Sequence, residues 1–265
     1  MIDTKQNLKH DFDTQGYTIA RGLFPRSRVD ELNAMAEEIH TTGAGGRYSH
    51  LSLEEAEGDV LQAYPRIMQP HRYNDTARAA MIDSGLADVL RELFEEEPLA
   101  VQSMYYFKPP GARGQAMHQD QFYLQVRPGT CIAAWIAMDY VDKENGGILV
   151  FPKTQNLDID CSKVGKAGSY EKGAKPIKIP AGLKAESTEM EPGDALFFNG
   201  SLIHGSASNR SNDRWRRSFI CHYVGVSCTT ISESYHPLVD MTGRDVVREK
   251  TTDGGPCGAW VGAAH

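Results

Sequence analysis

The sequence contains no apolar run near the roughly 18 residues that a membrane-spanning helix needs. Its first residues, MIDTKQNLKHDFDTQG, are polar and lack the apolar segment of a signal peptide. The five cysteines form no CxxC pair, which argues against a zinc site or a disulfide framework. Internal repeats and low-complexity tracts are also absent. We therefore expect a cytoplasmic protein with reduced thiols.

Basic residues are fewer than acidic residues in this sequence. Lysine and arginine number 28 against 35 acidic residues, and the net charge of −7 argues against nucleic acid or an anionic membrane as the main partner. The 40% hydrophobic and 24% charged residues are ordinary for a globular protein. A length of 265 residues fits one large β-rich domain, so we expect a single domain over 1–265 that acts on a small molecule.

The N-terminal part of the chain predicts helices after a first strand at 15–24. A helix opens at Pro25 and stops before Gly43, and its apolar residues recur at helical spacing: Val29, Leu32, Met35 and Ile39. A second helix is expected at about 84–96, with Ser84 as its cap and Pro98 beyond its end.

From residue 99 the pattern changes to short strands separated by turn residues. The expected strands are 99–108, 116–126, 130–141, 147–151, 187–191, 194–199, 201–205 and 216–224. Helices followed by short strands predict a mainly β protein with N-terminal helices (α+β). We expect its core to be a double-stranded β-helix, that is, a cupin-like jelly roll.

One lysine-rich segment, 153–184, interrupts these strands. It carries seven lysines against three acidic residues, a net charge of +4 in an acidic protein. A long insertion of this kind is often a lid or a binding loop. As a lid or substrate loop it would favour an anionic substrate, and the alternative is a solvated surface loop.

Three residues far apart in the sequence predict an iron site. His118 and Asp120 lie in AMHQDQFY, and His204 lies in SLIHGSASN. Because alternate side chains of a strand share a face, His118 and Asp120 would both point into the barrel. Two histidines and one carboxylate can bind one face of Fe(II) and leave the opposite positions open. For each histidine the alternative is a buried structural side chain.

An arginine on the strand after His204 suits an anionic co-substrate. Arg216 and Ser218 would share a face, and an arginine inside a barrel is costly without an anion. A guanidinium can hold a carboxylate with two hydrogen bonds, and a nearby hydroxyl can add another. Arg210 and Arg214 lie in a polar turn, and Arg217 should face the other way. Arg217 nevertheless stays open as the alternative to Arg216.

At these residues the chain resembles the phytanoyl-CoA dioxygenase family of Fe(II)/2-oxoglutarate-dependent oxygenases. The similarity covers most of residues 12–224 and is strongest in MYYFKPPG, AAWIAMD, NGGILVFPKTQ and GDALFFNGSLIHGSASNRS. The resemblance implies that the three residues above are iron ligands and that Ser206 joins Arg216 in binding 2-oxoglutarate. It also implies that Met104 and Trp135 line the co-substrate pocket. For these two the alternative is plain core packing.

The resemblance also implies the reaction. A dioxygenase of this family would use Fe(II), 2-oxoglutarate and O2 to hydroxylate an unactivated C–H bond of a small metabolite, releasing succinate and CO2. Gln102 and Gln119 are weaker candidates for polar contacts near the site. Asp120 argues against halogenation, because halogenating relatives replace this carboxylate with a small residue.

Two groups of alternatives stay open. Related oxygenases carry out desaturation, cyclisation or epimerisation with the same ligands. A non-oxygenase cupin-type metal isomerase or binding module is the other alternative, and such proteins often use three or four histidines for the metal.

Overall fold

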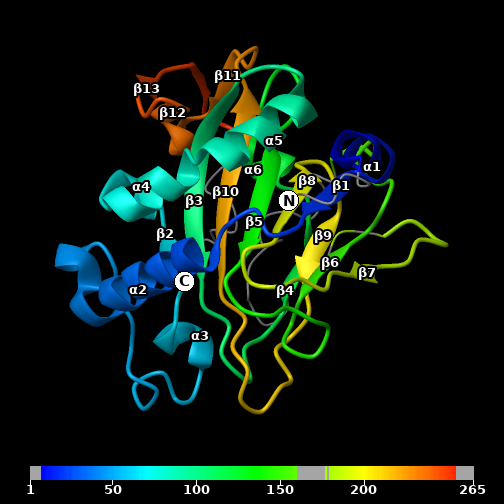
Figure 1. Cartoon of the computed structure of the whole chain (residues 1–265). Coiled ribbons are helices and arrows are strands. Elements are labelled where there is room, and N and C mark those ends of the chain that lie inside the picture. Colours follow the sequence, from blue (N-terminus) through cyan, green and yellow to red (C-terminus); the bar gives the residue numbers. More distant parts are fainter. Residues whose placement is uncertain (1–6, 160–176, 178, 255–265) are drawn as a thin grey trace.

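A large and a smaller β-sheet form the centre of the protein, with helices against the outer face of the large sheet (Figure 1). The computed structural model describes residues 7–159, 177 and 179–254. Most of the lysine-rich segment, 160–176 and 178, therefore lies outside the described residues, and its role as a lid stays a prediction. The single domain over 1–265 also stays a prediction.

The large sheet is antiparallel throughout its paired strands. Its strand order is β1-β8-β5-β10-β3-β12-β13, and β2 also pairs with β3. The strands are β1 (Tyr17–Ala20), β2 (Ile67–Met68), β3 (Pro98–Tyr106), β5 (Ile132–Ala137), β8 (Ala195–Asn199), β10 (Ser218–Gly225), β12 (Leu238–Asp240) and β13 (Asp245–Val246).

The smaller sheet is also antiparallel, with the order β4-β9-β6-β7. It contains β4 (Gln115–His118), β6 (Ile148–Val150), β7 (Glu186–Ser187) and β9 (His204–Ser206). A separate parallel pair joins β11 (Thr230–Ser232) to β14 (Glu249–Thr251). Two facing antiparallel sheets with N-terminal helices confirm the prediction of a jelly-roll core.

Helices cover the face of the large sheet that points away from the smaller sheet, and Figure 1 shows α2, α4 and α5 on this side. The α-helices are α1 (Leu8–Gln15), α2 (Arg26–Thr42), α3 (Val60–Ala63), α4 (Asp75–Met81), α5 (Ser84–Phe94) and α6 (Gln121–Leu124). Short 3-10 turns are η1 (Gly43–Gly46), η2 (Pro70–Arg72) and η4 (Glu233–Tyr235).

The helix termini follow the sequence signals in one case and depart from them in the other. Pro25 is the N-cap of α2, and Gly43 ends this helix with a φ of 67°, a conformation that glycine adopts without strain. In α5 the expected cap was wrong. Asp83 caps the helix by accepting a hydrogen bond from the Gly85 N–H at 2.8 Å, and Ser84 is the first helical residue.

The central strands of the large sheet, β3, β5, β8 and β10, are buried on both faces. Phe197 and Phe219 point toward the helices and pack in one core with Leu32 of α2. The next residue along, Phe198, points the other way and packs in a second core with Ile148 of the smaller sheet. This alternation places every second side chain of these strands between the two sheets, which is where a site can be built.

Two strand predictions need correction. The strand expected at 116–126 ends at His118, and the chain then turns into α6. No element was expected after residue 224, yet β11 to β14 lie there. No helix among the described residues is long and apolar enough to cross a membrane, and the cytoplasmic location stays a prediction. Cys131, Cys221 and Cys228 are buried and unpaired, as expected.

The packing of α2 predicts a stability effect. Leu32 is fully buried between α2 and the large sheet. Leu32→Ala should lower the free energy of unfolding by about 2–5 kcal/mol, because it removes apolar contacts and leaves a cavity. Glu38→Ala on the exposed side of the same helix is the control and should change it by less than about 0.5 kcal/mol. Chemical denaturation measures both, and equal effects would contradict the packing.

Candidate metal and co-substrate site

Three potential metal ligands meet between the two sheets. His118 ends β4 and His204 begins β9, and the two residues are paired in the strand register. With Asp120 they form a buried group whose ligand atoms all lie within 4.8 Å of one another. Nε2 of His118 is 3.4 Å from Oδ1 of Asp120, and Nε2 of His204 is 3.7 Å from Oδ2. One metal ion can therefore reach all three.

Asp120 reaches this position by a different route from the one expected. Its backbone is helical, with φ −65° and ψ −33°, and it is the N-cap residue of α6. The expectation that His118 and Asp120 share the face of one strand was therefore wrong. The chain turns after His118, and the turn is held by the Gln121 N–H, which donates to the Gly200 carbonyl at 2.9 Å.

Backbone carbonyls orient both histidine rings. Nδ1 of His118 lies 2.9 Å from the Ala116 carbonyl, and Nδ1 of His204 lies 3.0 Å from the Leu202 carbonyl. A carbonyl can only accept, so each Nδ1 carries the proton and each neutral ring leaves Nε2 as a lone-pair donor. Both Nε2 atoms face Asp120, which is the geometry that a shared metal requires.

The charges of the site also suit a metal. Burial alone would raise the pKa of Asp120, but the neighbouring His204, His222 and His118 hold this pKa well below its usual value. Burial lowers the pKa of His204 to about 4. At neutral pH the group thus offers a carboxylate and a neutral imidazole, the forms that bind metals. Two histidines and one carboxylate fit Fe(II).

A third histidine supports the carboxylate, and the sequence reasoning missed it. His222 of β10 is fully buried, and its Nε2 lies 2.9 Å from Oδ2 of Asp120. The signal was available, because His222 follows Ser218 at even spacing and so shares its face of the strand. His222 therefore positions Asp120 from the large sheet, opposite the two histidines of the smaller sheet.

A cavity lined by these residues also contains several of the predicted co-substrate residues. Met104 of β3, Trp135 of β5 and Arg216 line it together with the three candidate ligands. Apolar side chains complete the wall, including Ile148, Phe198 and Ile220. The cavity lies in the second core, between the sheets.

Arg216 is the buried cation of this cavity, with an exposed fraction of 2%. Its Nε donates to the Gly146 carbonyl at 3.2 Å, and its Nη1 donates to Ser218 Oγ at 3.2 Å. The guanidinium carbon lies 5.4 Å from the ring centroid of Trp135. These contacts aim a fixed positive group into the space that holds the three candidate ligands.

The competing arginines lie elsewhere. Arg217 forms a two-pronged ion pair with Asp139, with distances of 3.0 and 2.7 Å, and also lies 3.7 Å from Glu37 of α2. Arg210 is exposed. Arg214 belongs to a network of ion pairs in the turn before Arg216.

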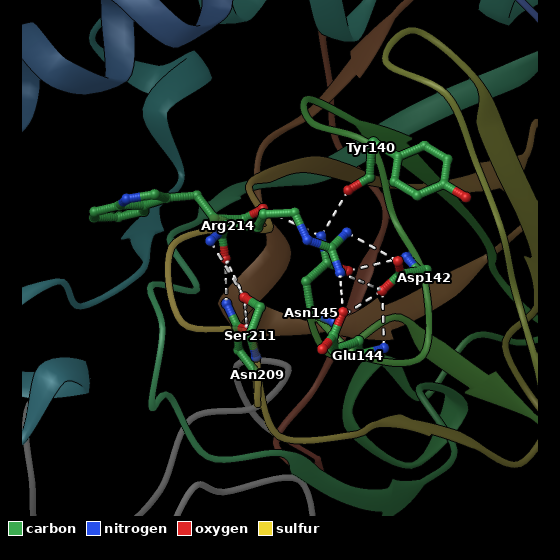
Figure 2. Close-up of polar contacts among 8 residues, drawn as sticks. Tyr140, Asp142, Glu144, Asn145, Asn209, Ser211 and Arg214 are labelled. Atoms are coloured by element: carbon green, nitrogen blue, oxygen red, sulfur yellow. Dashed lines mark hydrogen bonds and ion pairs between the residues drawn. The ribbon is translucent and has the colours of Figure 1, made fainter.

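That network fastens two loops together, as Figure 2 shows. The Arg214 guanidinium donates to Asp142 at 2.9 Å and to Glu144 at 2.6 Å. On the other side, the Asn209 amide donates to the Arg214 carbonyl at 2.7 Å, and the Ser211 hydroxyl donates to the same carbonyl at 2.9 Å. The turn that carries Arg216 is therefore tied to the loop that supplies the Gly146 carbonyl.

The remaining predicted residues are neighbours of residues that line the cavity. Ser206 of β9 is buried and accepts hydrogen bonds from Lys108 and Gln115, while Ser218 accepts one from Arg216. Gln102 is buried opposite His222 in the strand register, and its side-chain atoms hydrogen-bond to none of the described residues. Gln119 donates to the Ser201 carbonyl at 2.8 Å.

Two further basic residues near the cavity were not expected. Arg66, just before β2, is 6% exposed and donates to the hydroxyl of Tyr106, a lining residue, at 3.0 Å. Lys108, just after β3, is 2% exposed and donates to Ser206. No spacing pattern singles out either residue, because each lies outside a regular strand and reaches the site by a long side chain.

Solved structures share the fold of this chain. The chain resembles the non-heme alpha ketoglutarate dependent epimerase SnoN from nogalamycin biosynthesis, with a TM-score of 0.68 and 18% identity over 83% of each chain. It also resembles EctD from S. alaskensis, with a TM-score of 0.63 and 19% identity over 83% of this chain and 77% of that one. These likenesses show a shared fold.

The sequence places the chain within a known protein family. The profile of the phytanoyl-CoA dioxygenase (PhyH) family matches residues 12–218, so the chain belongs to that family, as predicted. Its members are oxygenases that depend on iron and 2-oxoglutarate, and the three candidate ligands agree with this requirement. The expected cofactor and co-substrate are thereby confirmed.

Individual relatives match part of the chain. A probable phytanoyl-CoA dioxygenase of Caenorhabditis elegans is 33% identical over 182 residues, which cover 62% of this chain and 58% of the relative. The peroxisomal phytanoyl-CoA dioxygenase of Rattus norvegicus is 32% identical over 147 residues, covering 51% and 41%. A phytanoyl-CoA dioxygenase of Arabidopsis thaliana is 28% identical over 257 residues, covering 80% and 86%. The chain thus spans about half the length of the first two.

The contact between His222 and Asp120 predicts an effect on metal affinity. His222→Leu should weaken Fe(II) binding about 10- to 100-fold, since an unsupported carboxylate can rotate away from the metal. His222→Gln, whose amide N–H can replace the Nε2 donor, should recover part of the loss. Metal titration followed by calorimetry without oxygen measures both.

The control is His71, another buried histidine, which contacts Ser103 at 2.7 Å and lies outside the cavity. His71→Leu should leave Fe(II) affinity unchanged. Wild-type affinity in His222→Leu would show that Asp120 holds its position without this hydrogen bond.

Proposed function

We propose that this chain is an Fe(II)- and 2-oxoglutarate-dependent dioxygenase that hydroxylates an unactivated C–H bond of a small molecule. His118, Asp120 and His204 would hold the iron, and Arg216 and Ser206 would hold the distal carboxylate of 2-oxoglutarate. The observation that carries the proposal is the meeting of the triad and a buried arginine in one cavity. Membership of a dioxygenase family supports it.

The cavity has the features that this reaction needs. Bound iron with 2-oxoglutarate and O2 supplies the oxidising power, and the oxo acid leaves as succinate and CO2. The protein's own part is to orient the oxo acid and to exclude water. Trp135, Met104, Ile148 and Phe198 give apolar walls to the cavity that contains the triad and Arg216.

The buried arginine distinguishes this proposal from a cupin-type isomerase or binding module. A guanidinium with 2% exposure is costly to bury, and a carboxylate ligand offsets that cost. An isomerase that needs only a metal has no use for such a cation. Desaturation, cyclisation and epimerisation remain as alternatives, because the same iron and oxo acid serve these reactions.

An assay of co-substrate turnover tests the class, and product mass tests the reaction. The purified protein with Fe(II), 2-oxoglutarate and O2 should release succinate, faster when its substrate is present in a metabolite extract. Hydroxylation adds one oxygen atom to the product, desaturation removes two hydrogens, and epimerisation leaves the mass unchanged.

His118→Ala and His204→Ala are the controls for this assay and should release no succinate above background. Hydroxylation would be refuted if the wild-type protein binds Fe(II) and 2-oxoglutarate but its product contains no additional oxygen atom. Full turnover by either alanine variant would refute the ligand assignment.

The co-substrate assignment makes a separate prediction. Arg216→Ala should raise the KM for 2-oxoglutarate, because loss of a buried charge pair costs about 2–5 kcal/mol. At about 1.4 kcal/mol per tenfold, this is a rise of roughly thirtyfold or more. Iron affinity should change far less.

Arg217→Ala is the matched control, since Arg217 pairs with Asp139 outside the cavity. It should leave the KM for 2-oxoglutarate within about twofold of the wild type. If the KM rises in Arg217→Ala and not in Arg216→Ala, the carboxylate is bound by Arg217 and the assignment to Arg216 is wrong.

A further inference from the structure

Lys108 is a buried lysine beside the proposed carboxylate subsite. It follows β3, is 2% exposed, and donates from Nζ to Ser206 Oγ at 2.9 Å and to the Ala207 carbonyl. Among the described residues, no carboxylate forms an ion pair with it. Buried lysines are rare without a partner of opposite charge, so this position calls for an explanation.

The hydroxyl of Ser206 is held in one orientation by its neighbours. Its Oγ accepts one hydrogen bond from Lys108 Nζ at 2.9 Å and another from the Gln115 N–H at 3.1 Å. A hydroxyl has two acceptor lone pairs and one hydrogen to donate. With both lone pairs engaged, the hydroxyl hydrogen is left to point at a third group, and a buried hydroxyl is expected to find an acceptor.

Gly146 brings Lys108 and Arg216 together. It has a φ of +86°, and a Cβ on this residue would lie 2.7 Å from Cε of Lys108. Its carbonyl accepts a hydrogen bond from Arg216 Nε at 3.2 Å. The Arg216 N–H in turn donates to the Lys108 carbonyl at 3.0 Å. The absence of a side chain at Gly146 thus gives the lysine stem its place next to the arginine.

Two basic groups placed together out of water favour an anion. Burial, and then the charge of Arg216, lowers the pKa of Lys108 well below its usual value. An added carboxylate would offset the cost of both groups and would accept the free hydrogen of Ser206. The added carboxylate would also favour the protonated form of Lys108, whose Nζ can only donate to Ser206 Oγ.

We propose that Lys108 is a positioning residue for the distal carboxylate of 2-oxoglutarate. It holds the Ser206 hydroxyl as a donor toward that carboxylate and places a second basic group beside Arg216. The inference rests on the proposed function, since it assumes that Ser206 and Arg216 bind this end of the co-substrate. The proposal predicts that Lys108 helps the protein to bind oxo acids that have a distal carboxylate more tightly than those that lack one.

The experiment compares two oxo acids on the same protein. The Fe(II)-loaded protein, kept free of oxygen, is titrated by calorimetry with 2-oxoglutarate and with 2-oxopentanoate, which lacks the distal carboxylate. Lys108→Met should raise the Kd for 2-oxoglutarate by about tenfold or more, equal to about 1.4 kcal/mol. The Kd for 2-oxopentanoate should change by less than about twofold, because the lost contact has no counterpart there.

Three variants complete the test. Ser206→Ala should lose the same discrimination, and Lys108→Met with Ser206→Ala should lose little more than either alone, since the two residues act as one unit. Lys143→Met, at an exposed lysine of the neighbouring loop, should match the wild type. If Lys108→Met does not fold, Lys108→Gln replaces it, with a loss in the same direction, because the shorter amide is neutral.

Two results would overturn the proposal. One is an unchanged Kd for 2-oxoglutarate in Lys108→Met. The other is an equal loss for both oxo acids, which is what general damage to the site produces. Failure of the proposed function looks different, because the wild-type protein would then bind neither oxo acid.

Discussion

The buried carboxylate of Asp120 is the constraint on which the rest of the site depends. A charged group with 1% exposure costs several kcal/mol of solvation, on the order of what a whole hydrogen-bond network returns. Three histidines surround it, two from the smaller sheet and His222 from the large one. The two sheets therefore meet at one charge, and their spacing is tied to the geometry of the candidate metal site.

A second polar centre lies on the same cavity and depends on loops. Arg216 takes its orientation from the Gly146 carbonyl and from Ser218, and the two loops behind it are joined by the ion pairs of Arg214. The candidate metal ligands are thus positioned by strand pairing, whereas Arg216 is positioned by a turn that the ion pairs of Arg214 stabilise. A ligand that binds the metal with one end and Arg216 with the other must have a length that matches the separation of these two groups, which the fold determines.

Sequence patterns predicted those parts of the protein in which local periodicity and tertiary packing agree. The helix α2 and the strands β3, β5 and β10 carry long apolar patterns that only one packing satisfies. The candidate iron ligands were predicted from residue chemistry. The helical backbone of Asp120 was not, because the turn after His118 depends on a contact with Gly200 that is distant in sequence. The short strands β11 to β14 carry too few residues for a pattern to form.

The double burial of β3, β5, β8 and β10 has a consequence for how such a protein can diversify. Almost every side chain of these strands is buried, so a substitution that reshapes the cavity from this side also disturbs packing. Changes in the smaller sheet and in the connecting loops are less constrained. New substrates are therefore most easily accommodated by substitutions in the smaller sheet and the loops. Substitutions in the large sheet are restricted because its side chains are needed for folding.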